Sequence, residues 1–280
     1  MGVRFNAMGS REGRSAMTVV DLLRWRCLLW AVAALLLAAC GAAEAPEGSP
    51  EASPAVVATL PSATGTAGPS SVRSPVSFVT EDNVVVKGHL YGTGRTAVVF
   101  AHMFPNDQRA WAGFAAEVAG QGYSALTFDF RGFGETGGQK DVSRIDRDLV
   151  SAVRFLRERD YDRVVLVGAS MGGTAALKVA ARDDLSDVIG GVVAVSAAES
   201  FRCLVARDDV SRISVPVLFV ASEGDDAAAR SLESLFERAG DFGQRQLFSG
   251  SAHGTGLLEG EHTVEFKALV LDFLRAVSSP

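Results

Sequence analysis

The sequence predicts an α/β fold with a mostly parallel sheet, helices on both faces and an antiparallel N-terminal hairpin. Past residue 75, segments with strand-like and helix-like periodicity alternate along the chain. The middle strands, such as 163–170 and 215–222, are continuous apolar runs, which is typical of strands covered on both faces by helices. With 280 residues and 48% hydrophobic side chains, the chain can bury a single core of this kind.

The elements follow in order from residue 76. VSFVT (76–80) and VVVKGHLYG (84–92) predict a hairpin around the turn at Glu81, Asp82 and Asn83. Further strands are expected at 96–102, 123–130, 163–170, 190–197, 215–222 and 245–250. Helices are expected at 108–122, 141–159, 171–182, 226–240 and 261–277. Between Ala197 and Val215 there is room for one short helix only, so no large lid is expected.

The N-terminus is interpreted as a targeting signal. Arg24 and Arg26 precede the apolar run CLLWAVAALLLAA (27–39), which has signal-peptide length and is short for a membrane span. Translation from Met17 instead of Met1 is a second hypothesis, since the stretch before Arg24 is long and mixed in charge. Either start leaves the apolar run as the part that is removed.

The end of that run, LAAC, resembles a bacterial lipobox. The resemblance implies a lipoprotein signal peptide over 1–39, a diacylglycerol group on the Cys40 thiol, and a membrane as partner through this lipid anchor. An ordinary secretory signal cut after an A-x-A-like site is the alternative. The expected location is therefore the bacterial cell envelope, with the exported chain anchored by lipid.

Residues 40–75 are rich in Ala, Pro, Ser, Gly and Thr with almost no large apolar side chains. Such a segment cannot bury enough surface to order itself, so it is expected to be a flexible tether. The catalytic domain is expected over 76–280.

Charge and spacing limit the ligands. The net charge is −6, and removing the signal takes away five arginines, so no basic stripe remains for a nucleic acid. No His-x-His, Cys-x-x-Cys or His-Glu-x-x-His spacing occurs, and neither a metal nor a cofactor is expected. Nothing in the sequence predicts a protein partner.

Ser170 stands between a buried strand and a helix, in VVLVGASMGGTAALK (164–178). A tight strand-to-helix turn strains the backbone of its central residue, and glycines two before and two after it, Gly168 and Gly172, remove Cβ atoms that would collide. The turn also directs the Met171 amide, at the positive end of the new helix, toward a reacting carbon.

This Gly-x-Ser-x-Gly turn in this position resembles the α/β-hydrolase superfamily, over nearly all of 76–280. The lidless layout is most similar to serine-esterase and dienelactone-hydrolase-like branches, although the latter typically carry cysteine where Ser170 stands. The resemblance implies a serine nucleophile, an acid and then a histidine, in that order along the chain.

The resemblance implies His253, in the loop after the last strand, as the base, with His262 as a less favoured choice that is otherwise a solvent-exposed residue at a helix start. The acid is expected at the tip of strand 215–222, where a Gly-x-x-Asp pattern with Ser222 in the glycine position indicates Asp225. Asp226 stays open as the acid, although its alternative role is the N-cap of the helix that follows. Glu199 is a less favoured substitute.

Two further stretches fit the resemblance. FAHMFPND (100–107) is similar to the loop that supplies the second oxyanion-hole amide, which would be that of Phe104 beside Met171. Met103 replaces the usual glycine and puts the loop's shape in doubt. FDFRGFGETGG (128–138) is similar to a segment in which Asp129 and Arg131 brace the loops around the site.

The glycines of that segment also suggest a rival, a dinucleotide-binding fingerprint at Gly132, Gly134 and Gly137. The fingerprint requires a helix directly at the glycines, whereas the next helix is expected only near Asp141. A second rival is a non-catalytic binding lipoprotein of the same fold, for which Met103 and Ser222 are the main support.

The favoured prediction is a serine hydrolase that cleaves carboxylic esters or thioesters of small or flexible substrates. Ser170, His253 and Asp225 would act through an acyl-enzyme, with the amides of Phe104 and Met171 as the oxyanion hole. A serine peptidase of the same fold is an alternative.

Overall fold

A computed structural model describes residues 73–278 of the chain. The predicted signal peptide, Cys40 and most of the predicted tether lie outside the described residues, as do the last two positions. Strand β1 begins at Arg73, three residues before the expected domain start at Val76. Residues 73–75, assigned to the tether from their composition, pair with β2 from Tyr91 to His89.

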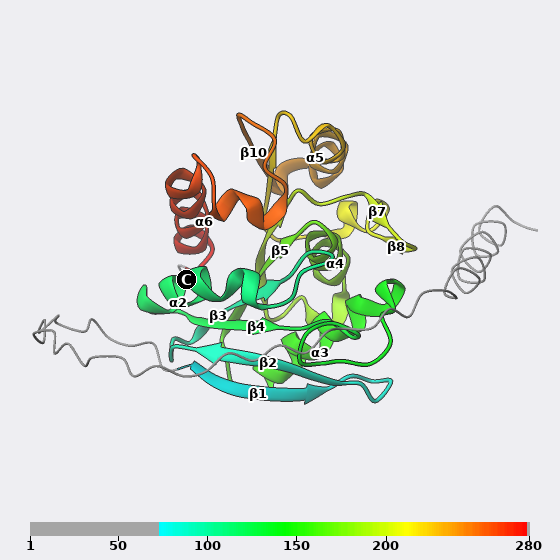
Figure 1. The fold of residues 1–280 in the computed structure, drawn as a ribbon, viewed down its shortest axis with the longest axis vertical. Coiled ribbons are helices and arrows are strands. Elements are labelled where there is room, and N and C mark those ends of the chain that lie inside the picture. The colour runs from blue at the N-terminus through cyan, green and yellow to red at the C-terminus, as the bar shows by residue number, and fades with distance from the viewer. Residues whose placement is uncertain (1–72, 279–280) are drawn as a thin grey trace, which may run out of the picture. The chain divides into compact units, whose positions relative to one another are not determined.

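An eight-stranded sheet forms the centre of the fold (Figure 1), in the order β1-β2-β4-β3-β5-β6-β9-β10. The strands are β1 (Arg73–Val79), β2 (Val85–Tyr91), β3 (Thr96–Ala101), β4 (Ser124–Phe128), β5 (Arg163–Ala169), β6 (Ile189–Val195), β9 (Val217–Ser222) and β10 (Gly243–Phe248). β2 is antiparallel to both β1 and β4, and the remaining pairs are parallel. The predicted fold class is confirmed, including the N-terminal hairpin.

Helices cover both faces of the sheet. The helices are α2 (Arg109–Gly120), α3 (Ile145–Arg157), α4 (Met171–Ala180), α5 (Asp226–Ala239) and α6 (Thr263–Ser278). α2 and α6 lie on one face, and α3, α4 and α5 on the other (Figure 1). Successive residues of β5 point to opposite cores: Val164 and Leu166 pack toward α3 and α4, whereas Val165 and Val167 pack toward α2 and α6. Burial on both sides explains the continuous apolar runs.

The connection between β6 and β9 holds more than the one short helix expected. It contains a hairpin of two-residue strands, β7 (Ser200–Phe201) and β8 (Leu204–Val205), and one 3₁₀ turn at Val210–Arg212. The absence of a large lid from this connection agrees with the prediction. Within residues 73–278, no helix combines the length and apolar character needed to cross a bilayer.

A buried arginine ties the hairpin to the helical layer. Arg131 donates hydrogen bonds to Asp148 of α3 and, at 2.7 and 3.0 Å, to Asp82 in the β1–β2 turn. The hydrogen bonds from Arg131 hold the pKa of Asp82 far below its ordinary value of 3.8. Burial opposes the charge of Arg131, but the two carboxylates outweigh it and raise the arginine pKa. Arg131 therefore braces the β1–β2 turn against α3.

Candidate active site

Ser170 occupies the junction between β5 and α4 in a strained conformation. Its φ of 47° and ψ of −113° lie in a region that residues other than glycine rarely adopt. Its amide donates to the carbonyl of Val195 at 2.7 Å, and its carbonyl accepts from the amide of Thr174 at 2.9 Å. Contacts on both sides hold the strain, which is a pattern that recurs at active sites.

The two glycines of the motif are required by close backbone approaches. A Cβ on Gly168 would lie 2.3 Å from the carbonyl oxygen of Gly172, and one on Gly172 would lie 2.3 Å from that of Ala101. The first approach closes the turn around Ser170. The second presses the start of α4 against the end of β3, and so places the loop that begins at His102 beside the serine.

Asp225 and His253 meet across the loops that follow β9 and β10. The Asp225 Oδ2 atom lies 2.6 Å from His253 Nδ1. Asp225 is the N-cap residue of α5, but its side chain makes no capping hydrogen bond, which leaves the carboxylate to the histidine. Asp226, which the sequence suggested as the N-cap, is instead the first residue of the helix, and the N-cap position is that of Asp225.

The loop that carries His253 is fixed to the strand ends around Ser170. The Gly254 amide donates to Ser196 Oγ at 3.0 Å, and Ser222 Oγ donates to the Ala252 carbonyl at 2.8 Å. A Cβ on Gly254 would lie 3.3 Å from that of Ala169. The residue after the histidine therefore packs against the residue before the serine, which brings the two chemical groups to the same edge of the sheet.

The less favoured residues are engaged elsewhere. His262 Nε2 lies 2.7 Å from Ser249 Oγ and 3.2 Å from Glu261, and its ring packs on Phe248. Glu199 hydrogen-bonds Ser234 and lies 3.6 Å from Arg207. Neither contacts His253 in the described part of the chain.

A buried histidine shapes the loop before Phe104. His102 Nε2 accepts from the Phe130 amide at 3.1 Å, so Nδ1 carries the proton and donates to the Met103 carbonyl at 3.0 Å. Burial lowers the pKa of His102, which keeps the ring neutral in this tautomer. Phe104 follows directly, and Met171 opens α4, where the first amides have no partner within the helix. The Met171 amide therefore lies directly after Ser170, and Phe104 follows the loop that His102 orders.

Met103 stands where related loops usually have glycine, and its side chain fills the space beside Gly254. A Cβ on Gly254 would lie 2.6 Å from Met103 Sδ, and the same sulfur accepts a hydrogen bond from Thr255 Oγ1 at 3.3 Å. The extra side chain in the oxyanion loop is therefore matched by glycine in the histidine loop.

The glycine-rich segment after β4 wraps a carboxylate. Asp129 accepts from the Gln108 amide and side chain and from the Glu135 amide, each at 2.8 Å. A Cβ on Gly134 would collide with that carboxylate. The segment opens no helix, since α3 starts at Ile145 after a 3₁₀ turn, so the requirement of the dinucleotide fingerprint is not met. Residues 73–278 contain no cluster of His, Cys, Asp or Glu suited to a metal ion.

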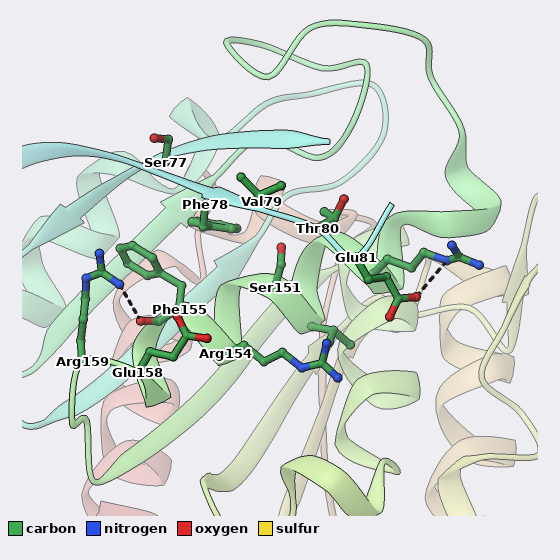
Figure 2. A pocket seen from close by; sticks show the side chains of 12 residues that line it. Ser77, Phe78, Val79, Thr80, Glu81, Ser151, Arg154, Phe155, Glu158 and Arg159 are labelled. Atoms are coloured by element: carbon green, nitrogen blue, oxygen red, sulfur yellow. Dashed lines mark hydrogen bonds and ion pairs between the residues drawn. The ribbon is translucent and has the colours of Figure 1, made fainter. Parts of the chain in front are cut away.

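A pocket of about 500 Å³ lies away from these residues, between the hairpin and α3 (Figure 2). Phe78 and Thr80 line it from the hairpin, and Ser151 and Phe155 from α3. Ser151 Oγ donates to a carbonyl of its own helix, and no histidine is among the residues that line the pocket. This pocket therefore lacks an activated nucleophile.

The sequence and the fold were both matched by known proteins. The model of the alpha/beta hydrolase family matches residues 98–277. The chain belongs to this family.

Solved alpha/beta hydrolases share the fold at low identity. The Pyrococcus furiosus esterase Pf2001 is 19% identical with a TM-score of 0.64, over 78% of this chain and 99% of that one. The Paleococcus ferrophilus monoacylglycerol lipase is also 19% identical, with a TM-score of 0.61 over 69% and 99%. Among curated proteins, the quorum-quenching protein AidA of Acinetobacter baumannii is 34% identical over 95 residues, which is 31% of each chain. An uncharacterized Escherichia coli protein is 32% identical over 76 residues, 27% of its length.

Proposed function

We propose that this alpha/beta hydrolase is a serine hydrolase that cleaves carboxylic esters or thioesters through an acyl-enzyme. The observation that carries the proposal is the 2.6 Å contact between Asp225 and His253, held on a loop that packs beside the strained Ser170 turn. A serine hydroxyl needs a base, and the base needs a group that orients it. The esterase and lipase named among the structural neighbours agree with an ester substrate.

The mechanism follows from the direction of that contact. When His253 Nδ1 carries the proton and donates a hydrogen bond to the Asp225 carboxylate, the lone pair of Nε2 is left to accept the proton of Ser170 Oγ. The oxygen then bonds to the substrate carbonyl carbon, and the amides of Phe104 and Met171 receive the negative charge of the tetrahedral intermediate. His253 returns the proton to the leaving alcohol or thiol. A water deprotonated by His253 releases the acid and restores Ser170.

The binding-protein alternative depended mainly on Met103 and Ser222. Each now has a local explanation, because Met103 packs on Gly254 and Ser222 Oγ supports the histidine loop. A serine peptidase would use the same groups, but no observation in the described residues favours a peptide over an ester. We also propose the envelope location, with the tether and a lipid on Cys40 holding the domain near a membrane.

Replacing each of two adjacent aspartates tests the triad. Asp225→Asn should lower kcat for a small ester by about 10³-fold or more, because an amide no longer selects the reactive tautomer of His253. Asp226→Asn is the matched control and should keep nearly full activity. The measurement is kcat by initial rates on p-nitrophenyl acetate with both variants shown to fold by circular dichroism. Equal losses in the two variants would contradict the assignment.

A further inference from the structure

Two cations stand over aromatic rings at the rim of the candidate site. The Arg202 guanidinium lies 4.3 Å from the centre of the Phe104 ring and 5.5 Å from that of Phe201. The Lys140 ammonium lies 4.4 Å from the centre of the Phe133 ring and 5.8 Å from that of Phe104. Both cations are therefore gathered around Phe104, the residue whose amide is assigned to the oxyanion hole.

This aromatic group lies against the serine turn from two sides. Met103, before Phe104, contacts Gly254 beside the histidine. On the other side, the segment that leads into β7 packs on the first turn of α4, where Thr174 Oγ1 donates to the Ala198 carbonyl at 2.8 Å. The rings of Phe104 and Phe201 meet with centres 6.0 Å apart. They bridge the two segments that flank Ser170.

Neither cation has a carboxylate within salt-bridge distance among residues 73–278, although other charged groups nearby are paired. Arg109 pairs with Asp107, and Arg207 with Glu199. An aromatic face attracts a cation without neutralising its charge, so the outer N–H groups stay available to an anion. Because the chain as a whole carries a charge of −6, an anionic substrate would be repelled unless local cations received it.

The conformation of the β7–β8 turn directs the Arg202 side chain toward Phe104. Arg202 and Cys203 form the two-residue turn between β7 and β8, with φ of 45° and 70°. Such turns usually take asparagine and glycine, since positive φ is unfavourable for other side chains. Here the turn position carries a long cationic side chain that folds back on Phe104.

We propose that Arg202 and Lys140 form a carboxylate-recognition site, so that the preferred substrates are esters whose acyl chain ends in a carboxylate. This inference rests on the proposed function. His253 protonates the leaving alcohol and so defines the alcohol side of the site. The acyl chain then extends along Phe104 and Phe201, and its carboxylate accepts hydrogen bonds from the guanidinium and ammonium groups.

The test compares two matched ester series. Monomethyl esters of glutaric, adipic and pimelic acid are compared with unbranched fatty-acid methyl esters of equal chain length, using methanol release to obtain kcat/KM. The wild type should prefer the anionic series by about tenfold, and the preference should shrink with added salt. Arg202→Gln and Lys140→Gln should each reduce the ratio, and the double variant should bring it near one.

Arg159→Gln is the control, because Arg159 also stacks on a phenylalanine, Phe155, but at the end of α3 away from the site. It should leave the ratio at the wild-type value. If the wild type cleaves both series equally, or if the Arg202 and Lys140 variants keep the wild-type ratio, the carboxylate-recognition site is wrong and the proposed serine hydrolase is unaffected. If the wild type cleaves neither series and Ser170 resists a fluorophosphonate, both proposals are wrong.

Discussion

Ser170 carries a backbone strain that its neighbours maintain. A residue in such a conformation costs on the order of 1–3 kcal/mol, and the hydrogen bonds to Val195 and Thr174 oppose its relaxation. The strained turn exposes the side chain beyond the strand end, where an incoming carbonyl can reach it. The strain, the glycines and the neighbouring amides therefore all help to fix the position of the serine oxygen.

Much of this site could be predicted residue by residue, because its signals are local. The glycines around Ser170 mark the turn, and the resemblance to the α/β-hydrolase superfamily implies His253 and Asp225. The supports could not be predicted, since they join distant positions. The Ser196 hydroxyl that receives the Gly254 amide lies 58 residues away along the chain. Nothing in the sequence pairs them.

Among the elements, the contact between α4 and β3 decides where the loop that contains Phe104, the proposed oxyanion loop, lies. Gly172→Ala would place a methyl group 2.3 Å from the backbone oxygen of Ala101, which cannot yield as a side chain would. The helix must shift, so we expect a loss of about 2–4 kcal/mol in the free energy of unfolding and at least a tenfold loss of kcat. Urea unfolding and initial rates on p-nitrophenyl acetate measure the two effects.

Gly113→Ala is the control for that change. Gly113 lies within α2, and a Cβ there would meet nothing within 4 Å. Alanine in a helix interior should stabilise the protein by about 0.5–1 kcal/mol and leave kcat unchanged. An unaffected Gly172→Ala enzyme would show that the close approach does not position the loop.

Among the described strands, those of the β7–β8 hairpin were not predicted from the sequence. Its strands have two residues each, too short for any periodicity to emerge, and its turn lacks the usual asparagine and glycine. The long helices and buried strands were predictable because many residues repeat the same pattern. The hairpin's form depends on packing against α4 and Phe104, which only the folded structure contains.

At the scale of the whole molecule, Arg131 joins the hairpin turn to α3 through Asp82 and Asp148. The folded state lowers the pKa of Asp82 below its ordinary value of 3.8. The ionised carboxylate therefore stabilises the folded protein fully at pH values above 3.8, and this contribution is lost progressively as the pH falls below 3.8 toward the lowered pKa. Asp82→Asn should therefore cost about 1–3 kcal/mol at pH 7 and progressively less in stronger acid. Urea unfolding of both proteins at several pH values measures the difference, and a pH-independent cost would contradict the account.

The proposed anchor also concerns the whole molecule, although Cys40 lies outside the described residues. If the Cys40 thiol carries lipid, the wild type should sediment with membranes in a bacterial host, and Cys40→Ala should not. Comparable distributions of the two proteins in soluble and membrane fractions would contradict the proposed lipid anchor and would not bear on the proposed chemistry.

The intact mass of the purified protein after treatment with a fluorophosphonate shows whether Ser170 is an activated nucleophile. We expect one adduct on the wild type, none on Ser170→Ala, and slow labelling of His253→Ala, because the serine oxygen reacts only when a base removes its proton. A folded wild type that gains no mass would contradict an activated serine and favour the binding-protein alternative.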